Sequence, residues 1–180
     1  MNVLPRLFLL LPLSGCVADP AASWLGGIGD PVRGAALNAP RLLGDTAELA
    51  GNPSQAALAV VQLEFLNDQF RTNPTYMHNV SGATLHTVRV GKVEMRQAVG
   101  IAQDAPNDLV IGQLREAAAA LDAGSTARTE AALSGPMFPN GPGRTLARLS
   151  SLPRLPRVAD AAGAANAEII RFDRTGSRRS

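Results

Sequence analysis

The stretch PSQAALAVVQLEFLNDQFR, residues 53–71, decides the fold of this chain. Apolar side chains recur in it at spacings of three and four residues, which places them on one face of a helix. That face comprises Ala56, Val60, Leu63 and Phe70, with Val61 and Phe65 beside it. Asn52-Pro53 is typical of a helix start, and Asn73-Pro74 of a helix end. We therefore predict one long helix here, and the side chains predicted to face solvent are Gln62, Glu64, Asp68 and Gln69.

Further helices are predicted on both sides of this one. Asp30-Pro31 again pairs a capping residue with a proline at the first helical position. The other segments predicted to be helical span residues 81–99, 106–123, 125–134 and 145–152, with a last helix from about residue 158. In that last helix the apolar stripe comprises Val158, Ala162, Ala165, Ile169 and Phe172.

The segment 85–96 allows two interpretations. Val88-Arg89-Val90 and Val93-Glu94-Met95 alternate as strands do around Gly91-Lys92, which would make a hairpin. The apolar residues Leu85, Val88, Met95 and Val99 also fit helical spacing, and Ser81 is a suitable cap. We favour the helix, because an isolated two-stranded hairpin is marginally stable.

The composition excludes several classes of protein. With 46% hydrophobic and 18% charged residues in 180, the chain is neither wholly disordered nor a polytopic membrane protein. One cysteine excludes an internal disulfide framework, a cysteine-rich zinc site and an iron–sulfur cluster. Few aromatic and many alanine residues favour helices. We predict an all-α fold, an irregular bundle or array of about six helices, as a single domain over residues 30–175.

The first sixteen residues differ from the rest. Met1–Arg6 carries one positive charge, and the apolar run Leu7–Leu13 is far shorter than the ~20 residues of a membrane span. These features are typical of a secretion signal. The run ends in Leu13-Ser14-Gly15-Cys16, which contains the chain's one cysteine.

This ending resembles the lipobox of bacterial lipoproteins, in which an aliphatic residue and two small residues precede a cysteine. The resemblance implies that Cys16 carries a diacylglyceryl group, that cleavage between Gly15 and Cys16 removes residues 1–15, and that the new amine is acylated. Val17 stands where an aspartate would retain such a protein in the inner membrane. By this resemblance we expect attachment to the outer membrane, facing the periplasm. The alternative is a buried structural cysteine beside an ordinary signal peptide.

Residues 16–29 are predicted to form a flexible, lipidated tether, because they are rich in glycine and small side chains. Trp24 either settles among lipid headgroups or docks on its own domain. At the other end of the chain, residues 176–180 are predicted to be a disordered basic tail.

Charge is distributed unevenly along the chain. Residues 16–143 contain 8 basic and 12 acidic residues, a net charge of −4, whereas residues 144–180 contain 8 basic and 3 acidic residues, a net charge of +5. The basic residues of the second part are Arg144, Arg148, Arg154, Arg157, Arg171, Arg174, Arg178 and Arg179. Their guanidinium groups are candidates to contact anionic headgroups, peptidoglycan carboxylates or an acidic envelope protein. The alternative is that these arginines are ordinary surface residues, because the chain uses arginine in place of lysine and has one lysine, Lys92. A nucleic-acid partner is not expected in this compartment.

No catalytic motif is found, so we expect a binding or scaffolding protein, with no enzymatic activity, no metal and no cofactor besides the lipid on Cys16. One alternative is a carrier for an apolar ligand. Its cavity would be lined by Leu63, Phe65, Phe70, Met95 or Ile111. Another is an envelope hydrolase, which would need His78 or His86 in a pocket beside a carboxylate or a serine.

Overall fold

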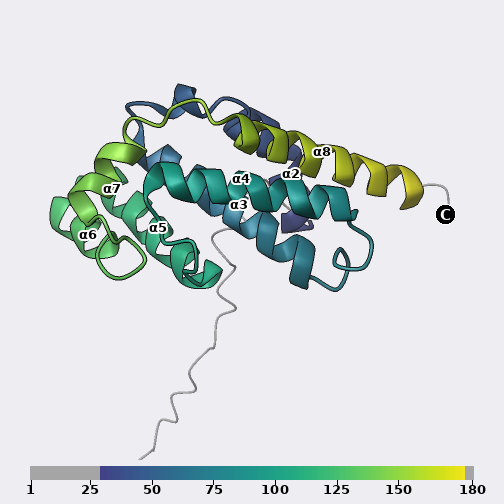
Figure 1. Ribbon diagram of the computed structural model, residues 1–180, viewed down its shortest axis with the longest axis horizontal. Coiled ribbons are helices and arrows are strands. Elements are labelled where there is room, and N and C mark those ends of the chain that lie inside the picture. Colours follow the sequence, from purple (N-terminus) through teal and green to yellow (C-terminus); the bar gives the residue numbers. More distant parts are fainter. Residues whose placement is uncertain (1–28, 177–180) are drawn as a thin grey trace, which may run out of the picture.

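The computed structural model describes residues 29–176. Within them the fold is all-helical, as predicted (Figure 1). The α-helices are α2 (Pro31–Leu43), α3 (Pro53–Thr72), α4 (Gly82–Val99), α5 (Asn107–Asp122), α6 (Thr126–Ala132), α7 (Pro142–Leu149) and α8 (Pro156–Gly176), and a 3-10 helix, η1 (Thr46–Leu49), joins α2 to α3. The predictions for Cys16, the signal peptide, the tether up to residue 28 and the tail from residue 177 concern residues outside the described range.

The predicted long helix, α3, is the centre of the bundle. It begins after the capping side chain of Asn52 and ends at Asn73, as the Asn-Pro pairs predict. It contacts α2, α4, α5 and α7, so few of its positions remain open to water. The prediction that Gln62 and Glu64 face solvent is therefore wrong, because their exposed fractions are 0% and 1%. The Gln62 amide donates a hydrogen bond of 2.7 Å to the carbonyl of Ala35 on α2.

The segment 82–99 is a single helix, so the hairpin interpretation of residues 85–96 is excluded. Helix α4 lies along α8, and the two make the most extensive contact in the fold (Figure 1). Gly91 permits this approach, since a Cβ atom there would come within 2.6 Å of the Ala161 Cβ and 2.7 Å of the Arg157 carbonyl oxygen. The glycine that suggested a turn in the sequence is therefore a site of close helix packing.

Each of these two helices supplies a carboxylate to the start of the other. Glu94 near the end of α4 accepts a 3.1 Å hydrogen bond from the backbone N–H of Val158. Glu168 near the end of α8 accepts one of 2.8 Å from the backbone N–H of Ser81, the cap of α4. The helices are therefore antiparallel, and both carboxylates lie where the helix dipole favours negative charge.

The remaining predictions differ in detail. Helix α7 begins at Pro142, three residues before the predicted start, because that proline occupies the first helical turn. The predicted stripe of α8 is buried from Val158 to Ile169, while Phe172 is half-buried. η1 was not predicted. Its residue Thr46 donates to the Pro153 carbonyl at 2.5 Å, and so ties η1 to the segment before α8.

Candidate functional site

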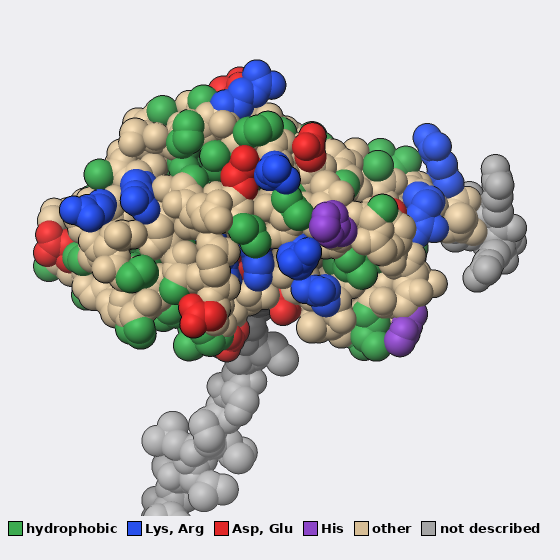
Figure 2. Space-filling view, in the orientation of Figure 1, with side chains coloured by type: hydrophobic (Ala, Val, Ile, Leu, Met, Phe, Trp, Pro, Cys, Tyr) green, Lys and Arg blue, Asp and Glu red, His purple; other side chains and the backbone are tan. Residues whose placement is uncertain are grey.

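The arginines predicted to contact anions do not form one patch in the part that the structure describes. Arg144 and Arg148 lie on α7, whereas Arg171 and Arg174 lie near the far end of α8 (Figure 1). Acidic side chains are interspersed among the basic ones on the face shown in Figure 2. Arg157 lies at the start of α8. Arg178 and Arg179 lie outside the described residues.

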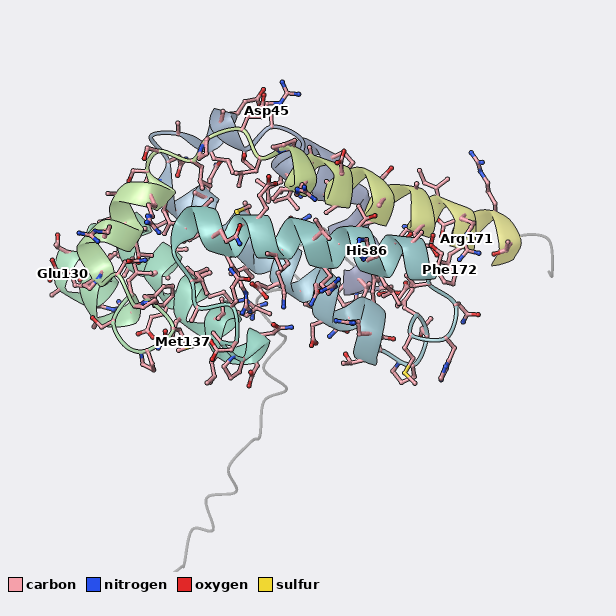
Figure 3. The ribbon with its side chains drawn as sticks, viewed as in Figure 1. Asp45, His86, Glu130, Met137, Arg171 and Phe172 are labelled. Carbon is pink, nitrogen blue, oxygen red and sulfur yellow. The ribbon has the colours of Figure 1, made fainter. Side chains whose placement is uncertain are left out.

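Two of these arginines have partners within the fold. Arg171 Nη2 donates to Glu168 Oε1 at 2.6 Å and to the Asn79 carbonyl at 2.7 Å, and its guanidinium lies 4.9 Å from the centre of the Phe172 ring (Figure 3). Arg154 is 4.0 Å from Asp45. Arg171 therefore joins α8 to the loop that precedes α4.

Glu168 of α8 accepts hydrogen bonds from residues at the start of α4 and from Arg171. Its exposed fraction is 5%, and it also accepts a hydrogen bond of 3.2 Å from Thr84 Oγ1. Burial alone would raise the pKa of this carboxyl, but the hydrogen bonds from Arg171, Ser81 and Thr84 outweigh burial and lower the pKa. The carboxylate is thus held in its charged form.

The start of α2 is fastened to the end of α8. Tyr76, in the loop between α3 and α4, donates its hydroxyl to Asp30, the cap of α2. The Tyr76 ring packs edge-on against Phe172, with ring centres 5.4 Å apart. Arg33 forms a two-pronged ion pair with Asp173, the closest approach being 2.9 Å. Burial and the bond to Asp30 raise the pKa of the Tyr76 phenol, so it stays a hydrogen-bond donor.

The two histidines lie on different elements. His78 is exposed in the loop between α3 and α4, and His86 is exposed on α4 (Figure 3). The histidine side chains stand apart on the molecular surface (Figure 2). His86 shares a shallow depression of about 170 Å³ with Thr87, Arg157 and Asp160. Among residues 29–176, no three His, Cys, Asp or Glu side chains gather where they could hold a metal ion.

The residues predicted to line an apolar cavity separate into two groups. Leu63, Phe70 and Met95 belong to the packed core, each with an exposed fraction of 1% or less. Phe65 and Ile111 are half-buried and line an open groove between α3 and α5. The five side chains therefore do not line one cavity.

A buried ion pair behind this groove was not anticipated. Arg96 of α4 has an exposed fraction of 0%, and its Nε and Nη2 donate to Glu64 at 2.5 and 2.9 Å. Arg96 Nη1 also donates to the carbonyls of Ala102, Gln103 and Ala105 at 2.9–3.1 Å. Burying a charge is costly unless it is paired and fully hydrogen-bonded, and this guanidinium meets both conditions. It joins α3, α4 and the loop that precedes α5.

Asn107 connects this ion pair to the groove. Its Oδ1 accepts hydrogen bonds from Arg96 Nη2 at 3.0 Å and from Lys92 Nζ at 3.2 Å. Lys92 Nζ is also 4.0 Å from Glu64. Burial lowers the pKa of Lys92, and Arg96 adds to that effect, while Glu64 opposes it. We call Glu64, Arg96, Lys92 and the Oδ1 side of Asn107 the buried network.

The groove has a volume of about 420 Å³. It is lined by Phe65, Asp68 and Gln69 of α3 and by Asn107, Asp108, Ile111 and Arg115 of α5. Asp68 accepts long hydrogen bonds from its neighbours on α3, at 3.3 Å from Gln69 and 3.4 Å from Thr72. Asp108 is exposed. This α3–α5 groove combines apolar surface with charges of both signs.

The chain was compared with models of protein families, with curated proteins and with solved structures, and none of them matches. None of the helices between residues 29 and 176 combines the length and the apolar character that crossing a membrane requires.

Proposed function

We propose that this protein is a lipid-anchored lipoprotein of the bacterial cell envelope, attached to the outer membrane and facing the periplasm, where its helical domain binds or scaffolds another component. The observation that carries the proposal is the position of the one cysteine, Cys16, directly after Leu13-Ser14-Gly15 and a short apolar run. A thiolate in that position suits the transfer of a diacylglyceryl group.

Lipid attachment accounts for the layout of the N-terminal part. Each acyl methylene adds about 0.8 kcal/mol of membrane affinity, so two or three chains anchor a protein almost permanently. Residues 17–29 would span at most roughly 45 Å when fully extended. The domain would therefore stay close to the bilayer surface, where envelope components are found.

The tether joins the domain at a well-held helix start. Asp30, the first residue after the tether, accepts hydrogen bonds from Tyr76 and from the backbone N–H of Val32. The adjacent ion pair of Arg33 with Asp173 joins the start of α2 to α8. The domain therefore begins at a fixed point, and a flexible tether would leave it free to turn relative to the membrane.

Palmitate labelling of the full chain in a Gram-negative host tests the proposal. We expect the wild-type chain to be labelled and shortened, and Cys16→Ser to be unlabelled and uncut, because serine lacks the thiol that accepts the lipid. Ser14→Ala is the matched control, since it keeps a small residue in the same motif. Labelling of the Cys16→Ser chain would contradict the lipid anchor, as would absence of label from the wild-type chain.

A further inference from the structure

We propose that the α3–α5 groove binds a short peptide of two or three residues with free termini, its amino group at the Asp68–Asp108 end and its carboxylate at Arg115. The inference deepens the binding role proposed above. It concerns the folded domain rather than the anchor, so labelling of Cys16 and binding in the groove fail or succeed separately.

The order of side chains along α5 gives the groove two different ends. Asp108, Ile111 and Arg115 lie three and four residues apart, which places them along one stripe of the helix. Asp68 of α3 and Asp108 of α5 line the same groove. α3 and α5 run antiparallel, since Ser54 near the start of α3 contacts the carbonyl of Ala118 near the end of α5. The end of α3 that carries Asp68 therefore lies beside the start of α5.

The groove consequently runs from an acidic end, through an apolar middle, to a basic end. Phe65 and Ile111 form the apolar middle. Arg115 supplies the positive charge at the other end. A guanidinium has five N–H donors, so a ligand carboxylate can join whatever Arg115 already contacts. A ligand with a cation, an apolar part and an anion in that order matches this arrangement.

The length of the groove selects the size of the ligand. Seven residues of helix separate Asp108 from Arg115, a rise of roughly 10 Å along the axis. The Arg115 side chain leans toward the start of α5, which shortens the gap between the two charges. Two or three extended peptide residues span roughly 7–10 Å, so a dipeptide or tripeptide fits.

Asn107 supplies a hydrogen-bond donor at the acidic end. Arg96 and Lys92 both donate to its Oδ1, which fixes the oxygen toward the buried network. Asn107 lines the groove, and the binding of its Oδ1 to the network leaves the amide nitrogen, Nδ2, to donate to a ligand there. Next to two carboxylates that accept from an amine, an amide N–H suits the first carbonyl oxygen of a peptide. A simple amine would leave this donor unused.

A free anion such as phosphate is the competing occupant. Helix α5 begins at the groove without a side-chain cap, and uncapped helix starts attract anions. Asp68 and Asp108 stand at that same end, and their charges repel an anion while attracting an amine. The charges therefore favour the peptide.

Titration calorimetry on the full chain in detergent micelles tests the proposal, with the tripeptide Ala-Leu-Ala as the probe. We expect saturable binding that weakens about tenfold or more when the peptide is N-acetylated, and again when it is C-amidated, because each modification removes one charged contact. Inorganic phosphate is titrated separately.

Paired changes in protein and peptide locate each end. Asp108→Asn is expected to weaken binding of the free peptide about tenfold and to leave binding of the N-acetylated peptide unchanged. Arg115→Gln is expected to weaken binding of the free peptide about tenfold and to leave binding of the C-amidated peptide unchanged. Glu116→Gln, an exposed neighbour on α5 that does not line the groove, is the control and is expected to have no effect.

Three results would overturn the proposal. The first is no saturable binding of Ala-Leu-Ala by a chain whose circular dichroism is helical. The second is equal binding of the free and the doubly blocked peptides. The third is saturable binding of phosphate that the tripeptide does not displace, which would identify the groove as an anion site.

Discussion

Helix α3 carries Glu64 and Asp68 one turn apart, and the two carboxylates have opposite surroundings. Glu64 belongs to the buried network, where Arg96 donates to both of its oxygens and its exposed fraction is 1%. Asp68 lines the open groove and accepts long hydrogen bonds from neighbours on its own helix. The same residue type therefore holds helices together in one place and is available to a ligand in the other.

The difference depends on what the neighbouring elements supply. On the Oδ1 side of Asn107, α4 contributes Arg96 and the following loop contributes backbone carbonyls, so the guanidinium and the Glu64 carboxylate are hydrogen-bonded inside the protein. On the groove side of Asn107, Asp108 is exposed and the other lining side chains of α3 and α5 are half-buried. We therefore expect substitutions in the buried network to alter the stability of the fold, and substitutions in the α3–α5 groove to alter peptide binding.

The largest effect is expected from Arg96→Met. The change removes both Arg96 hydrogen bonds to the buried Glu64 carboxylate and leaves it only Lys92, 4.0 Å away, which costs about 3 kcal/mol or more of unfolding free energy. Urea denaturation followed by circular dichroism measures it. Arg89→Met, an exposed position on the same helix, is the control and should change stability by less than about 0.5 kcal/mol. Equal losses of unfolding free energy at the two positions would show that the buried ion pair does not stabilise the fold more than an exposed arginine does.

The next largest effect is expected at the apolar contact between α4 and α8, and it shows how the loss of stability there compares with the loss in the buried network. Gly91→Ala places a Cβ within 2.6 Å of the Ala161 Cβ. We expect a loss of about 1–3 kcal/mol, because the helices must move apart. Gly112→Ala on α5 is the matched control, since nothing lies within 4 Å of the added methyl group. It should raise stability by about 0.5–1 kcal/mol, so a gain at both positions would refute the close approach.

Glu168 extends the comparison to pH, because it is buried like Glu64 but binds three donors from two helices. Its pKa is lowered below the ordinary value of 4.5, so its stabilising effect is present above that pH and is lost as the pH falls through and below it. Glu168→Gln should lose about 1 kcal/mol at neutral pH and show a flatter acid branch. The exposed Glu130→Gln serves as control. An unchanged acid branch in Glu168→Gln would exclude this role.

Asn107→Asp tests the residue that divides the two regions. The substitution keeps an oxygen for Arg96 and Lys92 and removes the amide donor that faces the groove. We expect stability to change by less than about 1 kcal/mol, while binding of Ala-Leu-Ala weakens about tenfold. A large loss of stability with intact binding would reverse the assignment of the two sides of Asn107.

The smallest effect on stability is expected from the groove carboxylates. Asp68→Asn and Asp108→Asn, alone or together, should change the unfolding free energy by no more than about 0.5 kcal/mol each, because Asp108 is exposed and the half-buried Asp68 accepts only long hydrogen bonds. Thermal unfolding of the three variants measures this. A loss comparable to that of Arg96→Met would mean that the groove is part of the structural framework.

The sequence predicts the helices well and the buried network poorly, for one physical reason. Helix starts such as Asn52-Pro53 and apolar stripes such as that of α8 depend on residues close together in the chain. The partner of Glu64 comes from residue 96, and no local spacing encodes that contact. One signal was available, because Lys92 and Arg96 fall at the spacing of the buried residues Val88, Met95 and Val99 on α4. A cation on the buried face of a helix predicts a buried anion beside it, because an unpaired buried charge is costly.

The groove is not predicted from the sequence. Of the five residues proposed to line an apolar cavity, Phe65 and Ile111 line this open groove instead. Leu63, Phe70 and Met95 were named with them, but they are core residues, because α3 is covered by neighbours on the sides where they point. Sequence periodicity separates apolar from polar faces, but it does not show which part of a central helix its neighbours leave uncovered.

The most direct test of the two-sided role of Asn107 is an NMR titration of the ¹⁵N-labelled chain with Ala-Leu-Ala. We predict that the side-chain amide signals of Asn107 shift progressively with added peptide, while the Nε–Hε signal of the buried Arg96 stays in place. A shift of the Arg96 signal as large as that of Asn107, or no shift of Asn107 at peptide saturation, would contradict it.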